Sequence, residues 1–312
     1  MNVGSFSMSG NVFSAVLFRQ GDRSFPCLGA SPSPTLGGDM KSRSFLFSGL
    51  GLLLAATLLF SACGRSDSPS KSAGGVKPLV VGMELAYPPF EMMDEQKRPC
   101  GVGVEMVYAL GQHLGRPVEI ENIPFTGLIL ALKGGRVDLV VASMTATEER
   151  AKSIDFSDPY VRTGLGILVP KASTVQSVAD LDQAGRKVAV KRGTTGHTYA
   201  MEHLKNAEVL VMESSAPAVM EVSQGKADAF IYDQLSIYQN WKKYPDSTRA
   251  LLAPFQRESW AIGLRKGNDE LRGQVNAFLK DFRQRGGFEQ LGDKYMKELK
   301  AAFKEQGIEF VF

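Results

Sequence analysis

The chain has 312 residues, of which 44% are hydrophobic and 22% charged, so it is long enough for two hydrophobic cores. Residues 1–63 carry four basic and two acidic side chains, and the rest of the chain carries 32 basic against 31 acidic ones. This balance offers no electrostatic footprint for nucleic acid, and because only Cys100 of the three cysteines lies beyond residue 63, a disulfide framework is excluded.

Residues 40–63 have the order of an export signal. Lys41 and Arg43 precede an apolar stretch at 45–60, and small residues then lead to Cys63. As a helix this stretch would measure about 24 Å, short of the roughly 30 Å hydrocarbon core, so a permanent membrane span is the weaker alternative. The sequence LFSAC at 59–63 resembles the bacterial lipoprotein box, with Phe60 in place of the usual aliphatic residue. This resemblance implies a lipoprotein signal peptide at 40–62 and a lipid on Cys63.

The segments around this signal show no periodic pattern. Met40 would make a normal start for the signal, so we expect residues 1–39 to be an upstream extension without regular structure. Residues 63–77 begin with a Ser- and Gly-rich stretch, which predicts a flexible tether between the lipid and the folded part.

From residue 79 the chain alternates short β-branched runs with amphipathic stretches, a pattern typical of α/β domains with largely parallel sheets. Helices are predicted at 103–114, 127–133 and 268–284 from apolar residues spaced three or four apart. Strands are predicted at residues 79–82, 118–121, 139–143, 164–169, 187–190, 209–212, 227–231 and 261–264.

Seven short blocks follow one another in a recognisable order. They are VGMELAYPPFE at 81–91, ALKGGRVD at 131–138, SMTATEER at 143–150, IDFSDPY at 154–160, GTTG at 193–196, GKADAF at 225–230 and Asp233. Together they resemble the periplasmic amino-acid-binding proteins of bacterial ABC importers, solute-binding protein family 3. The resemblance implies an α/β, two-lobed type II periplasmic-binding-protein fold, with two mixed, mostly parallel sheets joined by two crossover strands. Lobe 1 would hold residues 78–167 and 263–312, and lobe 2 residues 168–262.

The resemblance also implies a function. The chain would be a monomeric, lipid-anchored binding protein, in the periplasm or at the outer face of the cell membrane, that delivers an amino acid to the permease of an ABC importer. No enzyme activity, cofactor or metal is expected, since the histidines His113, His197 and His203 lack metal-site spacing. Two alternatives on the same fold are a dehydratase acting on prephenate or arogenate and a ligand-sensing ectodomain.

The ligand's main-chain groups would be held by seven residues. Arg150 would bind the carboxylate through two parallel hydrogen bonds, although most arginines are solvated. Thr194 and Thr195, between a strand and a helix start, would complete this clamp, and Thr194 could equally be a helix N-cap. Asp233 would accept from the ammonium, or cap the next helix. The family position further assigns ligand contacts to Ala142, Ser143 and Thr145.

Three further residues would surround the ligand's side chain. Tyr87 and Phe125 occupy positions where the family places aromatic surface, and core packing is the alternative for Phe125. Glu84 would leave one excess negative charge after the zwitterion neutralises Arg150 and Asp233, which favours a cationic side chain. The alternatives are that Glu84 pairs with a protein cation, or that the pocket prefers a polar neutral ligand.

Overall fold

The computed structural model describes residues 76–308 and residue 312 of the chain. The predictions for the upstream extension at 1–39, the signal peptide at 40–62, Cys63 and most of the tether therefore lie outside the described residues.

The first lobe is built on three parallel strands with helices between them. Strand β1 (Leu79–Met83) pairs in parallel with β4 (Val118–Asn122) on one side and β5 (Leu139–Val140) on the other. The connections contain the helices α1 (Val102–His113) and α2 (Leu128–Lys133), the short hairpin of β2 (Met92–Met93) and β3 (Pro99–Cys100), and a 3-10 turn, η1 (Phe125–Gly127). The predicted strand at 139–143 ends early, because Ser143 has a positive φ of 48° that no strand residue adopts.

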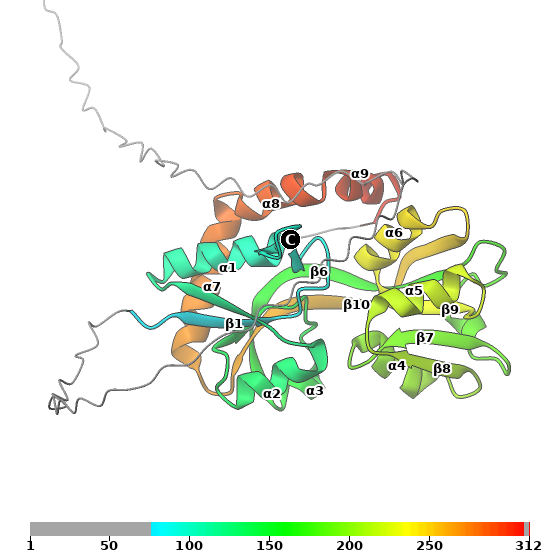
Figure 1. The fold of residues 1–312 in the computed structure, drawn as a ribbon, viewed down its shortest axis with the longest axis horizontal. Helices are drawn as coiled ribbons and strands as arrows, with labels where there is room; N and C mark the ends of the chain where they lie inside the picture. The colour runs from blue at the N-terminus through cyan, green and yellow to red at the C-terminus, as the bar shows by residue number, and fades with distance from the viewer. Residues whose placement is uncertain (1–75, 309–311) are drawn as a thin grey trace, which may run out of the picture. The chain divides into compact units, whose positions relative to one another are not determined.

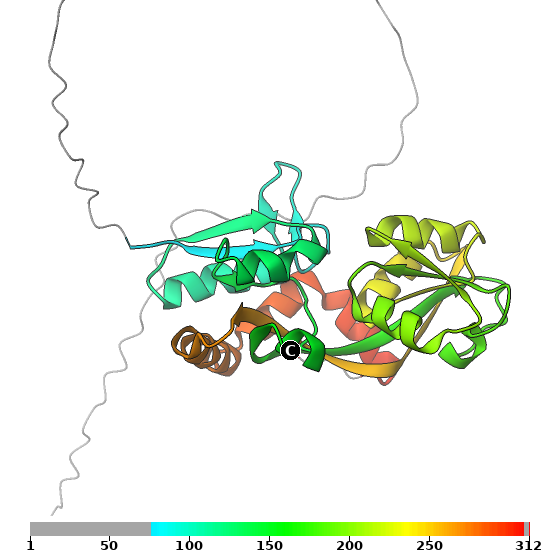
Figure 2. The ribbon, with the colours of Figure 1, turned by 90° about the horizontal axis from the view of Figure 1, so that it is seen from below.

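Two long strands carry the chain out of this lobe and back again, as Figures 1 and 2 show. After helix α3 (Glu148–Ala151), strand β6 (Ile154–Pro170) pairs antiparallel with β10 (Thr248–Arg265). Both are much longer than the predicted 164–169 and 261–264. Because these strands belong to both lobes, all the larger strands form one eight-stranded sheet in the order β4-β1-β5-β10-β6-β9-β7-β8, in place of two separate ones.

The pairing of the two crossing strands has three irregularities, and the widest lies where β6 begins to pair with β9 of the second lobe. Leu165 pairs with Gln256, but Ile167 already pairs with Leu251, so the residues between 251 and 256 have no register partner. Gly164 faces this gap, where an added Cβ would lie 2.5 Å from the Cβ of Pro254. Only a glycine therefore lets the two strands approach this closely.

The second lobe repeats the parallel arrangement on the other side of β6. Strand β7 (Lys187–Lys191) lies between β8 (Glu208–Met212) and β9 (Ala229–Asp233) and is parallel to both, while β9 is antiparallel to β6. The remaining elements of this lobe are η2 (Val178–Leu181), α4 (Thr195–His203), α5 (Ser215–Ser223) and α6 (Gln234–Lys243). The residue boundaries predicted for the two lobes, at 167/168 and 262/263, stay a prediction.

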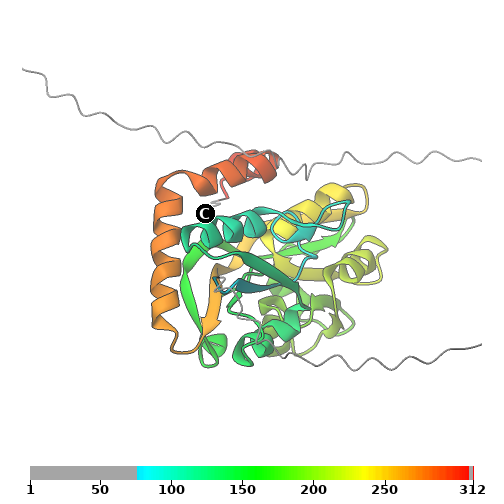
Figure 3. The same ribbon diagram turned by 60° about the vertical axis from the view of Figure 1, so that its left-hand side comes forward.

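After β10 the chain returns to the first lobe and ends in three helices, α7 (Asp269–Gln284), α8 (Gly287–Tyr295) and α9 (Lys297–Glu305). Figure 3 shows α7 along one side of this lobe, with α8 turning away from its end. Helix α7 buries Leu271, Val275 and Phe278, whose spacing of three or four residues predicted this helix. The C-terminal Phe312 stacks on Phe288 of α8, with ring centroids 5.5 Å apart.

Candidate functional site

A small cavity lies between the two lobes. The structure brings all ten residues predicted for the ligand site to this one cavity: Glu84, Tyr87, Phe125, Ala142, Ser143, Thr145, Arg150, Thr194, Thr195 and Asp233. Four more residues complete its lining: Leu165, Tyr232, Glu258 and Trp260. Whether any of the fourteen binds a ligand stays a prediction.

Arg150 is held in the cavity by backbone carbonyls from both lobes. It lies on the short helix α3, whose N-cap Thr147 accepts a hydrogen bond from the Arg150 amide. Its Nη1 donates to Thr145 O at 2.7 Å and its Nη2 to Gly193 O at 2.9 Å. Its guanidinium carbon lies 5.4 Å from the ring centroid of Phe125. Two of the five N–H groups are thus used, and within residues 76–308 no carboxylate lies within 4.0 Å of the others, so the guanidinium can still hold an anion bidentately.

Burial changes the acidity of this guanidinium. It lowers the pKa of Arg150 below the usual value, while the negative charge of Glu258 acts in the opposite direction. An arginine stays protonated in proteins despite such a shift. A buried cation without an ion-pair partner is costly, and a bound carboxylate would remove that cost.

The start of helix α4 faces Arg150 from the second lobe. Thr194 is its N-cap and accepts from the His197 amide at 3.3 Å, while its own hydroxyl donates to Lys191 O at 2.7 Å. The predicted N-cap role is therefore confirmed. Thr195, the first helical residue, lines the cavity with its amide end, where the helix dipole favours an anion.

Asp233 joins the two lobes at the opposite end of the cavity. Its Oδ1 accepts from Tyr87 Oη at 2.6 Å and from the Ser236 amide at 2.9 Å, so it is also the N-cap of α6. Only 5% of its surface is exposed. Burial raises the pKa of Asp233 to about 6, against the lowering effect of the two hydrogen bonds, and the charge of Glu258 raises it further. At neutral pH the carboxylate is thus mostly ionised and can accept from an ammonium.

Glu84 does not carry a free negative charge, because it forms an ion pair with Lys191 of the second lobe. The Lys191 and Glu84 side chains are only 5% and 15% exposed, and the Lys191 ammonium lies 5.4 Å from the ring centroid of Phe125. Of the two alternatives for Glu84, pairing with a protein cation is the one that the structure contains. The excess charge expected from Glu84 is thereby removed.

A fully buried carboxylate contacts Ser143 of the cavity lining. Glu91 has no exposed surface, and its Oε2 accepts from Ser143 Oγ at 2.9 Å, while its Oε1 has no partner among the described residues. Burial raises the pKa of Glu91 to about 8, against the lowering effect of the Ser143 hydrogen bond. At neutral pH this side chain is therefore largely protonated, and its bond to Ser143 fixes the residue whose φ is positive.

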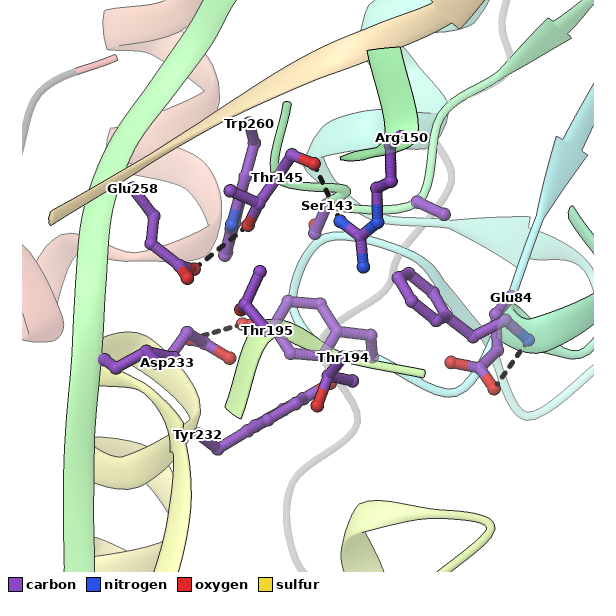
Figure 4. A pocket seen from close by; sticks show the side chains of 14 residues that line it. Glu84, Ser143, Thr145, Arg150, Thr194, Thr195, Tyr232, Asp233, Glu258 and Trp260 are labelled. Atoms are coloured by element: carbon purple, nitrogen blue, oxygen red, sulfur yellow. Dashed lines mark hydrogen bonds between the residues drawn. The ribbon is translucent and has the colours of Figure 1, made fainter. Parts of the chain in front are cut away.

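Figure 4 shows how these side chains are distributed around the cavity. Glu258 and Asp233 lie on one side, Glu84 lies on the other, and the guanidinium of Arg150 lies between them. Sequence reasoning missed Glu258 and Trp260 because the predicted strand began at residue 261. Their spacing of two on β10, which places both on one face of the strand, was the available signal.

Comparison with known proteins identifies the family. The model of the bacterial extracellular solute-binding proteins, family 3, matches residues 79–298. The chain belongs to this family. Its relatives include the ABC transporter glutamine-binding protein GlnH of Bacillus subtilis, which is 35% identical over 271 residues that cover 81% of this chain and 97% of GlnH. The arginine-binding extracellular protein ArtP of the same organism is 33% identical over 251 residues that cover 78% and 96% of the two chains.

A solved structure of the ancestral amino-acid-binding protein AncCDT-1, described as a precursor of cyclohexadienyl dehydratase, superposes with a TM-score of 0.66. It is 35% identical and covers 70% of this chain and 95% of its own. These matches confirm the predicted family, the two-lobed fold and the solute-binding role. Between residues 76 and 308, no helix has the length and apolar character needed to cross a bilayer.

Proposed function

We propose that this protein captures an L-amino acid in the cavity between its lobes and delivers it to the permease of an ABC importer. The observation that carries the proposal is the pairing of one unneutralised guanidinium, Arg150, with one buried carboxylate, Asp233, in a single cavity. An amino acid offers the matching carboxylate and ammonium, and the amide end of α4 adds oriented dipoles for the carboxylate.

The charges at the side-chain end favour a polar, uncharged ligand side chain. Glu84 and Lys191 neutralise each other there, so a cationic ligand would meet Lys191 and an anionic one would meet Glu84. Phe125 offers an aromatic face to the same region. Glutamine is the first candidate, since GlnH is a glutamine-binding relative, and arginine, bound by ArtP, is the second.

The location of the protein follows from its N-terminal segment. We propose that Cys63 carries a lipid and holds the protein as a monomer at the outer face of a membrane or in the periplasm. One acyl chain alone binds a membrane only marginally, whereas the several acyl chains of a lipoprotein cysteine give stable anchoring.

An enzyme on this fold is the competing function, and the likeness to AncCDT-1 is the observation that favours it. A dehydratase needs a general acid in the cavity, but Glu84 is engaged in an ion pair, and Asp233 and Glu258 already accept hydrogen bonds from Tyr87 and Thr145. We therefore propose that the protein is not an enzyme. Incubation with prephenate or arogenate, followed by a search for the aromatic product, tests this directly.

Binding calorimetry of the wild-type protein against the twenty amino acids tests the proposed function, and Arg150 variants test the site. Removing one partner of a buried charge pair costs about 2 to 5 kcal/mol, so Arg150→Ala should weaken binding by about 30-fold or more. Arg150→Lys should recover only part of this loss, because the bidentate geometry is gone. Arg136→Ala is the matched control, since Arg136 has a 64% exposed side chain in a surface ion pair and should change affinity by less than about 1 kcal/mol.

A folded Arg150→Ala protein with native affinity would contradict the site assignment. Wild-type protein that binds none of the twenty amino acids would contradict the proposed ligand class.

A further inference from the structure

A second carboxylate, Glu258, lies in the cavity wall and has no role in the site as proposed so far. It comes from the crossing strand β10, together with Trp260 on the same face of that strand. Only 6% of its surface is exposed. Its Oε2 accepts from Thr145 Oγ1 at 3.0 Å and its Oε1 from Gln256 Nε2 at 3.1 Å. Glu258 is thus buried, fixed in orientation and in contact with the cavity.

The hydrogen bonds of Glu258 come from neutral groups alone. In the part of the chain that the structure describes, no lysine, arginine or histidine nitrogen lies within 4.0 Å of Glu258, in contrast to Glu84 and its partner Lys191. Neutral donors offset only part of the cost of burying a carboxylate, and a cation in contact offsets more. Each carboxylate oxygen also has a second acceptor position, so both can accept one more donor.

The place of Glu258 decides which part of a ligand can supply that cation. In Figure 4, Glu258 and Asp233 lie on the same side of the cavity, and Glu84, at the side-chain end, lies on the other. Glu258 also acts electrostatically on both main-chain-binding residues, because its charge raises the pKa of Asp233, after the larger effects of burial and hydrogen bonding, and opposes the lowering of the pKa of Arg150 by burial. A cation on this side of the cavity can therefore interact with both carboxylates.

We propose that Glu258 is a second acceptor for the α-ammonium of the bound amino acid, which would lie between Glu258 and Asp233. This inference rests on the proposed function and deepens it. An ammonium has three N–H donors, so two carboxylates can accept from it at once. The site would then select for a free, protonated α-amino group more strongly than one carboxylate could. The ligand class is accordingly primary α-amino acids, and analogues without the amino group are rejected.

The test compares ligands with and without the α-amino group. Calorimetry is carried out on the wild-type protein and on Glu258→Gln with glutamine, with glutaramate, which is glutamine without its α-amino group, and with arginine. The side-chain amide of Glu258→Gln keeps an oxygen that can accept from Thr145, so the local hydrogen bond can persist. Glu208→Gln is the matched control, because the Glu208 side chain is 59% exposed on β8 in the second lobe. Thermal unfolding of both variants checks the fold.

We expect Glu258→Gln to weaken glutamine binding by about 10- to 100-fold, the loss expected for one hydrogen bond to a charged group, and to leave glutaramate within about threefold. Glu208→Gln should change neither ligand. An equal loss for both ligands would overturn the proposal in favour of a role in positioning Thr145. A loss confined to arginine would assign Glu258 to the ligand's side chain, and unchanged binding of both glutamine and arginine would exclude it from the site.

Failure of the proposed function has a different signature. Wild-type protein that binds glutaramate as tightly as glutamine would overturn the ammonium site as a whole, including Asp233. A wild-type preference for glutamine that survives in Glu258→Gln overturns the role of Glu258 alone.

Discussion

The ion pair between Lys191 and Glu84 makes a prediction about ligand selectivity that can be worked out from its burial. The two side chains are 5% and 15% exposed, so Lys191→Met leaves the Glu84 carboxylate buried without its cation. Breaking a buried pair in this way costs about 3 to 5 kcal/mol. A ligand that places a cation near Glu84 recovers part of this cost on binding, whereas an uncharged ligand recovers none.

We therefore expect the wild-type protein to bind glutamine more tightly than arginine, and Lys191→Met to shift this preference toward arginine by at least about 2 kcal/mol, or roughly 30-fold. Calorimetry with glutamine and arginine measures the shift as a ratio of dissociation constants, so a general loss of stability cancels. Lys152→Met is the control, because Lys152 and its partner Glu149 are both exposed. In this variant the ratio of the two dissociation constants should stay within about threefold of the wild-type ratio.

An unchanged ratio in folded Lys191→Met would refute the idea that Lys191 sets the charge of the side-chain end. A shift toward glutamine would refute it as well, because Glu84 would then offer no attraction to a cationic ligand.

Four further predictions concern stability, the pH dependence of binding, ligand dissociation and membrane anchoring. The pKa of Glu91 is about 8 in the folded protein against 4.5 in the unfolded chain. Its contribution to the free energy of unfolding, up to about 5 kcal/mol, is therefore present below pH 4.5 and lost as the pH rises through 8. Urea unfolding at pH 5 and pH 9 should show this loss in the wild type and not in Glu91→Gln. Because Asp233 titrates at about 6 and binds ammonium only when ionised, amino-acid affinity should be constant above pH 7 and fall by up to about tenfold per unit below pH 6; a flat profile down to pH 5 would contradict this. Tyr87→Phe removes the hydrogen bond between the lobes and should raise the dissociation rate constant by about tenfold in stopped-flow experiments, with little change in association. Cys63→Ser should leave the protein unprocessed or soluble on membrane fractionation, and mass spectrometry that finds an unmodified mature N-terminus elsewhere would contradict lipidation.

The parts of the fold that follow from short-range patterns could be predicted from the sequence. The β-branched runs that form β1, β4, β7 and β8 were placed within a residue or two, and α7 within one. The crossing strands were predicted at less than half their length, because residues 154–163 and 248–258 mix polar with apolar side chains and contain one proline each. They are strands because they pair with each other, which is a tertiary contact that no local pattern contains.

The same distinction applies to the candidate site. The resemblance identified ten residues that meet in one cavity, although no local pattern connected residue 84 with residue 233. The partner of Glu84 could not be predicted, since Lys191 lies 107 residues away and one position beyond the strand predicted for it. A charge that is neutralised through the fold cannot be recognised in a count of charges along the sequence.

The gap in the ladder between β6 and β10 has a mechanical consequence. Two fully paired strands would resist bending as a unit, because every hydrogen bond across them would have to deform together. The register jumps from Leu251 to Gln256 beside Gly164 and shifts twice more between Trp260 and Gly263, so this irregular part of the ladder is a weak joint. Bending would concentrate at this weak joint, so that each lobe turns as a rigid body while the ladders on both sides of the joint stay intact. Stiffening of the joint would then slow the entry and exit of the ligand without altering a single atom that touches it.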